Sequence, residues 1–509
     1  MKSLCPLLAT LLLYSGSCAP APAAERPPNL VIVFADDMGY GDPQVYNDRS
    51  RIPTPHIDAL AERGMRFTDA HTASSVCTPS RYGLLTGRYP WRSRLPVGIV
   101  DSWGGPVIDA DRLTLGKMLQ QKGYATACIG KWHLGWDWPL RGGGYLSDEL
   151  EGVNVPAARQ EATGLRIDFS RPIRSGPVTR GFDYYFGDDV PNFPPYAFLE
   201  NDRVLTAPTD RMPAQKGQRV GPMTPNWDLF AVQPTIAARA IEWLEERAAE
   251  PEKPFFLYMP LLGPHTPIVP SYPYRGRSDA GQYGDWAHQM DAMLGRVVET
   301  LERTGQMENT IVVFSSDNGS PARSGLGTFG QTNTVTELYS HVPNAPWRGL
   351  KADAWEAGHR VPLVIRWDGR IRAGVANDVT VCLTDLFATV AELFGVELPD
   401  DAGEDSFSLA PLLLANRSER YARRQIVHHS HQGLFAIRKG DWKLILGSGS
   451  GGFSQPRGQI VEPGQEGPMQ LYLLTEDPSE RRNRIEEFPA RKQELLDELG
   501  SLIRNGRSR

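Results

Sequence analysis

The sequence predicts an α/β protein with a large, mixed but mostly parallel sheet sandwiched by helices, followed by a smaller C-terminal α+β domain. Apolar, β-branched runs recur along most of the chain, and helical patterns separate them, as in a sheet built by crossover connections. After about residue 424 the pattern changes to short alternating runs and one final amphipathic segment. With 509 residues, the chain is long enough for two domains.

Five apolar runs are predicted to be strands of the large sheet. The first, 29–34 (NLVIVF), has no polar interruption, which is typical of a strand buried on both faces. The other four are 124–129, 254–262, 310–314 and 361–365. Helices are predicted between them from apolar positions that recur every three or four residues, often with Thr or Pro at the start and Gly at the end: 54–64, 114–123, 235–249, 290–301 and 384–394.

The C-terminal domain, 424–509, is predicted to hold a small antiparallel sheet and one helix. Its strands are expected in 434–439, 442–446 and 470–474, and its helix in 489–502, where leucines gather on one side. Two stretches rich in glycine are predicted to lie at the surface. These are a long insertion at 141–176 and a flexible hairpin loop at 447–467.

The first 24 residues are predicted to be a signal peptide, which leaves 25–423 as the main domain. Lys2 precedes an apolar run at 4–14, and small residues continue to Ala24. We therefore expect a secreted or periplasmic protein. Cys18 lies in a weak match to a lipoprotein cleavage box, so a lipid anchor there is the alternative. No later segment is apolar and long enough to predict a transmembrane span.

Charge and cysteine content exclude two other classes of protein. The chain has 54 basic and 60 acidic residues, so its net charge of −6 gives no basic footprint for nucleic acid. Outside the signal peptide only Cys77, Cys128 and Cys382 remain, which is too few for a disulfide framework. Cys128 and Cys382 lie in apolar surroundings and are expected to be core residues.

Polar side chains follow four of the predicted strands, at the point where each strand ends. Because ligands bind beyond the carboxyl ends of parallel strands, we expect these groups to converge at one edge of the sheet. Asp36, Asp37, Asp317 and the Asn318 amide oxygen form an all-oxygen set, which suits Ca²⁺ or Mg²⁺. The other strand-end groups are Lys131, His133 and His265.

The stretch Cys77-Thr78-Pro79-Ser80-Arg81 is predicted to begin a helix, with Pro79 at the first helical position. Cys77 would then lie at the positive end of the helix dipole, with Arg81 one turn further on. The longer run CTPSRYGLLTGR, 77–88, resembles the signature of the type I sulfatases of the alkaline phosphatase superfamily. In that family a maturation enzyme oxidises the cysteine to formylglycine (3-oxoalanine).

The resemblance implies a site for the remaining polar residues. Asp36, Asp37, Asp317 and Asn318 would hold one Ca²⁺ that also touches the modified Cys77. Arg81, Lys131 and Lys351 would neutralise the sulfate. One hydroxyl of the formylglycine hydrate attacks sulfur in such enzymes, and the second expels sulfate, with His133 assisting that step and His265 protonating the leaving alcohol.

The resemblance covers nearly the whole mature chain, with some departures. Leu350, just before Lys351, and Ala357 stand where the family usually has glycine. The loop 187–192 lacks the serine with which some arylsulfatases contact sulfate, and Asn192 is the predicted substitute. The C-terminal run LYLL, 471–474, followed by Glu-Asp-Pro, resembles the terminal-domain motif of the family. Nearby, His428, His429 and His431 are either a solvated strand edge or substrate contacts, for which we name His428 and His431.

These features predict an exported sulfatase that acts on a sulfate monoester of a carbohydrate. A phosphonate or phosphate monoester hydrolase of the same superfamily is the first alternative, because some phosphonate hydrolases share the Cys-x-Pro-x-Arg motif. Its phosphatases need two zinc ions, and no pair of histidines in the sequence indicates a second metal site. A secreted glycan-binding protein without catalysis is the second alternative, and it requires unmodified Cys77.

Loops after the strands are predicted to bind an anionic sugar. The insertion 141–176 and its surroundings carry several arginines, of which we name five, and the loop 187–196 adds Phe193. Trp136, Trp138 and Tyr145 could stack on sugar faces. A solvated basic loop is the alternative for the arginines, which are Arg159, Arg166, Arg171, Arg174 and Arg180.

Overall fold

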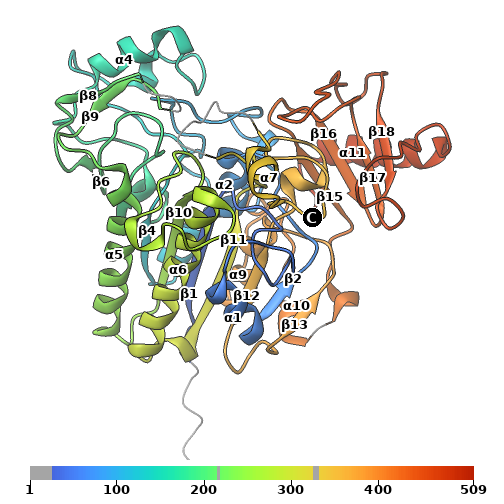
Figure 1. Ribbon diagram of the computed structural model, residues 1–509, viewed down its shortest axis with the longest axis horizontal. Helices are drawn as coiled ribbons and strands as arrows, with labels where there is room; N and C mark the ends of the chain where they lie inside the picture. Colours follow the sequence, from blue (N-terminus) through green and yellow to red (C-terminus); the bar gives the residue numbers. More distant parts are fainter. Residues whose placement is uncertain (1–25, 215–217, 325–331, 416) are drawn as a thin grey trace, which may run out of the picture.

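The computed structural model describes residues 26–214, 218–324, 332–415 and 417–509. It has a ten-stranded mixed sheet between two layers of helices and, beside it, a four-stranded antiparallel sheet formed by the C-terminal part of the chain (Figure 1). This architecture confirms the predicted fold class. The predicted signal peptide, 1–24, and Cys18 lie outside the described residues. Within the described residues, no helix is both long and apolar enough to cross a membrane.

Strand β1 (Asn29–Asp36) lies inside the large sheet, and all eight of its residues are buried. It pairs in parallel with β10 (Phe255–Pro264) on one side and with β11 (Thr310–Ser316) on the other. Its side chains alternate between two cores. Leu30, Ile32 and Phe34 belong to one, and Val31, Val33 and Ala35 to the other. Helices on both faces therefore explain the uninterrupted apolar run.

The rest of the sheet continues outward from these three strands in the order β13-β2-β12-β11-β1-β10-β4-β5-β6-β7. The pairs from β11 to β5 are parallel, whereas β12 runs antiparallel to β11. The fifth predicted strand is thus present but reversed in direction. The remaining bounds are β2 Met65–Phe67, β4 Ala125–Ile129, β5 Tyr184–Gly187, β6 Leu199–Glu200, β7 Arg203–Val204, β12 Leu363–Arg366 and β13 Val375–Asn377.

Helices cover the two faces of the sheet in separate layers. Apolar residues of α1 (Pro55–Arg63), α5 (Leu229–Ala248) and α6 (Gly281–Arg303) join one core. The other core includes residues of α2 Cys77–Thr86, α3 Leu115–Gln121, α9 Asp385–Leu393 and α10 Ala410–Ala415. The five predicted helices are all present, but α5 and α6 begin earlier than expected.

Helix α5 begins at Leu229, six residues before the predicted start at Thr235, and includes Pro234. Asp228 caps the first turn by accepting a hydrogen bond from the Phe230 N–H. Pro234 cannot donate to the carbonyl of Phe230, four residues earlier. The Ser271 hydroxyl donates to that carbonyl at 3.0 Å instead. A tertiary hydrogen bond thus replaces the one that proline removes.

The stretch 141–176 is not simply a surface insertion. It contains α4 (Gln160–Arg166), and its apolar residues, among them Leu146, Val153 and Ile167, join the core that also holds Trp136 and Trp138. Both tryptophans are only 1% exposed, so they pack in the core and present no face to a sugar. Smaller elements nearby and elsewhere are β3 Ala70–His71, β8 Asp210–Met212, β9 Gly221–Met223, β14 Val381–Cys382, α7 Thr334–Tyr339 and α8 Glu356–His359.

The C-terminal sheet has the order β15-β16-β17-β18, with every neighbouring pair antiparallel. Leu495, Leu499 and Leu502 of α11 (Pro489–Asn505) share its core. The predicted loop at 447–467 folds back on itself through a bridge between Gly447 and Ile460, and its Ser450 carbonyl accepts a hydrogen bond from Ala354 N–H. The strands are β15 Gln425–His429, β16 Phe435–Lys439, β17 Trp442–Ile445 and β18 Gln470–Leu473.

Three buried histidines lie where the two sheets meet. His71 Nε2 donates to Asp69 at 2.7 Å, and its Nδ1 accepts from His359 Nδ1 at 2.9 Å. His359 Nε2 then accepts from Lys443 Nζ at 3.1 Å. The ring of His428 packs on His359 with centroids 3.5 Å apart. This hydrogen-bond order keeps His71 and His359 neutral, and burial lowers the pKa of all three rings.

Acid should destabilise this fold through its buried histidines. Burial lowers the pKa of His429 from 6.5 to about 4, so the unfolded chain takes up a proton on acidification before the folded protein does. The stability is therefore complete above about pH 6.5 and falls as the pH drops toward 4. Between pH 7.5 and 5, His429 alone should reduce the free energy of unfolding by about 2 kcal/mol, at roughly 1.4 kcal/mol per pH unit.

Urea unfolding at the two pH values measures this difference. The variant His429→Gln should show a shallower pH dependence than the wild type. Equal slopes for both proteins would contradict the assignment.

Candidate active site

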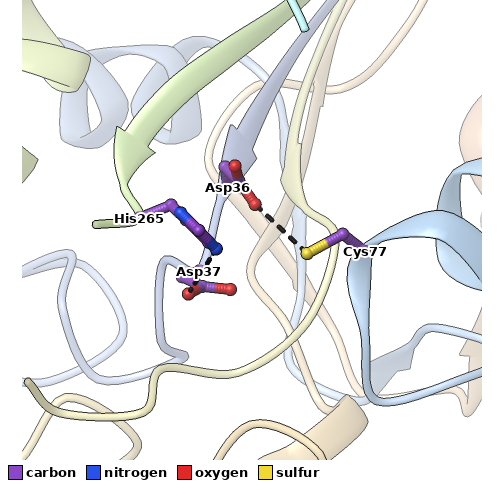
Figure 2. A group of neighbouring side chains, drawn as sticks. All are labelled: Asp36, Asp37, Cys77 and His265. Carbon is purple, nitrogen blue, oxygen red and sulfur yellow. Dashed lines mark hydrogen bonds and ion pairs between the residues drawn. The ribbon is translucent and has the colours of Figure 1, made fainter. Parts of the chain in front are cut away.

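The strand-end groups converge at one edge of the large sheet, as the sequence predicts. Asp36 ends β1 and Asp37 follows it, while His265 follows β10 and Asp317 follows β11. Figure 2 shows Asp36 directed at Cys77 and His265 directed at Asp37, with the four side chains grouped beyond the ends of the strands. The ligand atoms of these four side chains all lie within 4.8 Å of one another.

Helix α2 places Cys77 in this group. The helix begins at Cys77 itself, so Pro79 occupies the third helical position. The prediction that Pro79 takes the first position is therefore wrong. All ten residues of α2 are buried. The Cys77 Sγ lies 3.6 Å from Asp36 Oδ1 and 3.2 Å from Lys351 Nζ. Cys77 is therefore at the positive end of a buried helix, between a carboxylate and an ammonium group.

Glycine is required where β4 delivers Lys131 to the site. Gly130 has φ of +137°, and a Cβ at this position would lie 1.9 Å from the carbonyl oxygen of Pro260. Lys131 N–H donates to that same carbonyl at 2.9 Å. Any side chain at residue 130 would push β4 away from β10 and displace Lys131.

Three cations and three carboxylates form one buried cluster around Cys77. The contacts are Lys131 Nζ to Asp36 Oδ2 at 2.6 Å, Lys351 Nζ to Asp37 Oδ1 at 2.6 Å, and Arg81 Nη2 to Asp317 Oδ2 at 2.7 Å. Arg81 also lies 3.5 Å from Asp36. Loss of one partner from a buried pair typically costs about 3–5 kcal/mol, because the remaining charge is left uncompensated. The six side chains therefore depend on one another.

The cluster sets the protonation states of its members. Burial would raise the pKa of Asp37, but Lys351 and His265 lower it below its usual value. For Asp317, burial and the neighbouring Asp36 raise the pKa. Burial raises the pKa of the Cys77 thiol to about 12, although Lys131 and Lys351 oppose that shift. Cys77 is accordingly a thiol and not a thiolate at neutral pH.

His133 is held in the left-handed region of backbone space, with φ of 52°. Its N–H donates to Asp189 Oδ1 at 2.9 Å, and its carbonyl accepts from Thr78 Oγ1 at 3.0 Å. Nε2 donates to the Val100 carbonyl at 3.0 Å, so Nδ1 is the basic nitrogen. Nδ1 is buried and has no hydrogen-bond partner among the described residues. Burial, with Lys131 and Arg81, lowers the pKa of His133 well below its usual value.

His265 is similarly fixed. Its Nδ1 donates to the Thr266 carbonyl, which leaves Nε2 as the free lone pair, 3.9 Å from Asp37 Oδ2. Burial, and next Lys351, lower the pKa of His265 to about 3. Its position within the ligand group was not expected, because the sequence argument gave the metal only oxygen donors and Cys77.

The residues present fit a hard divalent cation. Asn318 Nδ2 donates to Asp37 Oδ1 at 2.7 Å, and its Oδ1 is buried without a hydrogen-bond partner among the described residues. A 180° turn of the amide would exchange the two atoms and aim Oδ1 at the side of the Asp37 carboxylate. Asp317 Oδ1 accepts from the Asp37 N–H at 3.1 Å. Oxygen donors from β1 and β11 are thus contiguous, as Ca²⁺ or Mg²⁺ requires.

A cavity of about 490 Å³ opens above the cluster. Asp37, Cys77, His133, His265 and Lys351 line its inner end, whereas Arg81 and Lys131 are buried behind it. The predicted Asn192 and His431 line the cavity, but His428 does not. His428 is 1% exposed and lies in the histidine cluster at the junction of the sheets, so it cannot touch a ligand in this cavity.

The arginines on the cavity wall are not those that the sequence argument named. The wall carries Arg219, Arg323 and Arg457, together with Phe193 and Phe453. None of the five predicted arginines lines the cavity. Arg180 donates to the Ile108 carbonyl, and Arg166 pairs with Glu149. Arg174 stacks on Tyr145, with its guanidinium 3.2 Å from the ring centroid. The cavity lining also excludes Arg159 and Arg171.

One other group of described residues has metal-ligating chemistry, although the sequence had indicated none. His71, Glu356 and His359 come within 4.8 Å of one another at the junction of the sheets. Lys443 Nζ already contacts Glu356 Oε1 at 3.0 Å and His359 Nε2 at 3.1 Å. A lysine ammonium thus occupies the position of an ion, so this group gives no second metal beside Cys77.

A site with these features suits an enzyme that acts on an anionic ester. Comparison with known proteins identifies the family of enzymes to which the chain belongs. A family model described as Sulfatase matches residues 28–396. The N-acetylgalactosamine-6-O-sulfatase of Bacteroides thetaiotaomicron is 31% identical over 506 residues, covering 95% of this chain and 94% of that protein. Human arylsulfatase A is 30% identical over 498 residues, covering 94% of this chain and 88% of that protein.

Solved structures agree with this match. A B. thetaiotaomicron sulfatase, from work on the metabolism of multiple glycosaminoglycans, superposes with a TM-score of 0.78 at 29% identity and covers 94% of this chain and 99% of its own. A phosphonate monoester hydrolase of Agrobacterium radiobacter shares the fold at a TM-score of 0.57 and 21% identity, covering 94% of this chain and 96% of its own. The chain belongs to the sulfatase family, whose members hydrolyse sulfate esters.

Thr78 joins the cysteine helix to the His133 segment, so its hydroxyl should matter for both stability and activity. It donates to the His133 carbonyl and accepts from the Val100 N–H at 3.1 Å. Thr78→Val should reduce the free energy of unfolding by about 1–3 kcal/mol, because two buried polar groups lose their partner. It should also lower kcat/KM for 4-nitrophenyl sulfate.

Thr78→Ser is the matched control, since it keeps the hydroxyl and should stay close to the wild type in urea unfolding and in kinetics. Equal behaviour of the Val and wild-type proteins would contradict this role.

Proposed function

We propose that the chain is an exported sulfatase that hydrolyses a sulfate monoester of a carbohydrate, with Cys77 converted to formylglycine and one Ca²⁺ beside it. The observation that carries the proposal is the position of Cys77. It is the first residue of a buried helix, 3.2 Å from Lys351 and 3.6 Å from Asp36, at the inner end of a cavity. The thiol itself is a poor nucleophile there, because burial raises its pKa to about 12.

After conversion, residue 77 would supply a hydrated aldehyde whose hydroxyl is the nucleophile. The ion would add positive charge beside it, held by Asp36, Asp37, Asp317 and Asn318. The chain's own groups do the rest. Lys351, at the cavity end, binds the sulfate oxygens, and Arg81 and Lys131 contribute positive charge from behind. Preorganised charges of this kind are typically worth about 10²–10³ in rate each.

The two histidines present one unprotonated ring nitrogen each to the inner end of the cavity. His133 presents Nδ1, because its Nε2 donates to Val100. It accepts a proton at that atom from the group at residue 77. His265 presents Nε2, because its Nδ1 donates to Thr266. Nε2 takes up a proton from solvent when the anionic ester is bound beside it, and it then passes that proton to the leaving alcohol oxygen. In the free protein both rings are neutral at physiological pH, since burial lowers the pKa of each.

A carbohydrate substrate is supported by the relatives and by the cavity. The B. thetaiotaomicron relative bears the name of an N-acetylgalactosamine-6-O-sulfatase. Phe193 and Phe453 on the wall offer apolar surface for a sugar, and Asn192 offers hydrogen bonds. The domain 25–423 contributes the chemistry, and the domain 424–509 contributes His431, Phe453 and Arg457 to the wall. Export rests on the predicted signal peptide at 1–24.

Replacement of Cys77 tests the nucleophile. Cys77→Ala should abolish hydrolysis of sulfate esters while the melting temperature stays within a few degrees of the wild type, since the thiol makes no strong bond. Cys128→Ala is the matched control, because Cys128 is equally buried but lies in β4, away from the cavity. Near-normal turnover by purified Cys77→Ala would refute the mechanism. A higher kcat/KM for a phenyl phosphonate monoester than for 4-nitrophenyl sulfate would favour the phosphonate hydrolase instead.

Removal of the ion should destabilise the folded protein. Without Ca²⁺ the carboxylate cluster loses a counter-charge, so chelation should lower the melting temperature and added Ca²⁺ should restore it. At 100 times the dissociation constant, a ligand stabilises by about 2.7 kcal/mol. Asp317→Asn should weaken the response to Ca²⁺, whereas Asp48→Asn, at an exposed position, should leave it unchanged. A melting temperature that is insensitive to chelator and to Ca²⁺ would contradict the metal assignment.

A further inference from the structure

The cavity holds more positive charge than one sulfate ester needs. Among the described residues that line it, Asp37 is the only carboxylate, and it is already paired with Lys351. Beyond the catalytic end, its wall carries three arginines and the imidazole of His431. A wall of this kind attracts a second anionic group on the ligand, since charge-assisted hydrogen bonds to carboxylate or sulfate are the strongest that arginine makes.

Arg219 forms a fixed part of this wall. Its guanidinium lies 3.9 Å from the centroid of the Phe193 ring. One edge pairs with Asp101 at 2.6 Å, and Nη1 donates to Gln160 at 2.9 Å. Asp101 therefore largely compensates the charge of Arg219, and Arg219 serves to hold Phe193 against the cavity. The positive charge that remains available to a ligand therefore belongs to another residue of the wall.

Arg457 supplies a positive charge on the cavity wall that no carboxylate of the described residues compensates. Its side chain is exposed and makes no hydrogen bond or ion pair within the described parts of the chain. Its backbone is fixed, because the Arg457 carbonyl accepts from Gly451 N–H at 2.9 Å. Beside it, His431 makes no side-chain hydrogen bond to any described residue, and its Nδ1 is buried without a partner. Two polar groups on adjoining loops thus face the cavity with nothing to bind.

The loop that carries Phe453 is locked to the catalytic lysine. Asp353 Oδ1 accepts from the N–H groups of Phe453 and Ser454 at 2.7 and 3.0 Å, and its Oδ2 accepts from Leu350 N–H at 2.8 Å. Gly452 is required at this contact, because a Cβ would lie 2.2 Å from the Ala352 carbonyl oxygen. Asp353 therefore fixes the position of the Phe453 loop relative to Lys351, which is next to Leu350 in sequence.

From this arrangement we infer that the substrate carries a second anionic group, a carboxylate or another sulfate, and that Arg457 and His431 bind it while the scissile sulfate lies at Lys351. The inference rests on the proposed sulfatase function and specifies its substrate. Arg457 supplies the charge and a planar fork of donors, and His431 supplies one hydrogen bond. Remote binding of this kind raises kcat/KM because it helps to orient the ester.

The test compares matched substrates with the full-length, matured enzyme. One pair is a disaccharide that joins a sulfated N-acetylgalactosamine to a uronic acid, and the same disaccharide with its carboxylate reduced to an alcohol. The other pair is N-acetylgalactosamine 6-sulfate and its 4,6-disulfate. We expect kcat/KM to be about tenfold or more higher for the anionic member of at least one pair. The pair that responds identifies the second group as carboxylate or sulfate.

Variants then assign the preference to residues. Arg457→Gln should reduce the ratio of the two kcat/KM values to near one, and Arg457→Lys should retain part of it. His431→Ala should reduce the ratio partially. Arg481→Ala removes an exposed arginine outside the cavity and should leave the ratio at its wild-type value.

Equal kcat/KM within both pairs, or a preference that survives in Arg457→Gln, would overturn this inference while leaving the sulfatase function intact. Failure to hydrolyse any sulfate ester, 4-nitrophenyl sulfate included, would overturn the proposed function and this inference with it.

Discussion

Mutual compensation of buried charge around Cys77 is the constraint on which the rest of the structure depends. Lys131, Lys351 and Arg81 cannot be buried without carboxylates, and Asp36, Asp37 and Asp317 cannot be buried without cations. Asp36 ends β1 and Asp37 follows it, whereas Lys131 and Asp317 lie just after β4 and β11. Arg81 belongs to α2 and Lys351 to the segment before α8, so the pairing of these six residues fixes the edge of the sheet. The same pairing holds the Lys351 ammonium group at the inner end of the cavity, where it can also contact a sulfate oxygen.

The C-terminal sheet depends on a second buried network and completes the cavity. Lys443 of β17 lies between Glu356 and Glu480, at 3.0 and 2.8 Å, and so joins the C-terminal sheet to the segment that follows Lys351. Asp353 adds the hydrogen bonds to the Phe453 loop. The position of the Phe453 loop on the cavity wall is therefore coupled to the position of Lys351, although the two are about a hundred residues apart in sequence.

Much of the fold and the inner part of the site could be predicted, because both follow from local patterns. The unbroken run of β1 required a sheet covered on both faces, and parallel strands bring Asp36, Lys131 and Asp317 to one edge.

Long-range packing decides the parts of the site that could not be predicted. Trp136 and Trp138 look like sugar platforms in the sequence, yet they are core residues. His428 lies on a strand buried on both faces, so alternation could not show which way it points. Arg219 and Arg457 reach the cavity only through tertiary folding. Lys351 reaches Cys77 despite the departures at Leu350 and Ala357, because Asp353 holds the loop.

We propose that this cluster surrounds a modified residue at position 77 and not a reactive thiol. The most direct test is the mass of the tryptic peptide 67–81 from protein that is active on a sulfate ester, together with its reaction with a hydrazide reagent. We expect the peptide to have lost its thiol and to carry an aldehyde at residue 77. An intact Cys77 thiol throughout a fully active preparation would contradict it.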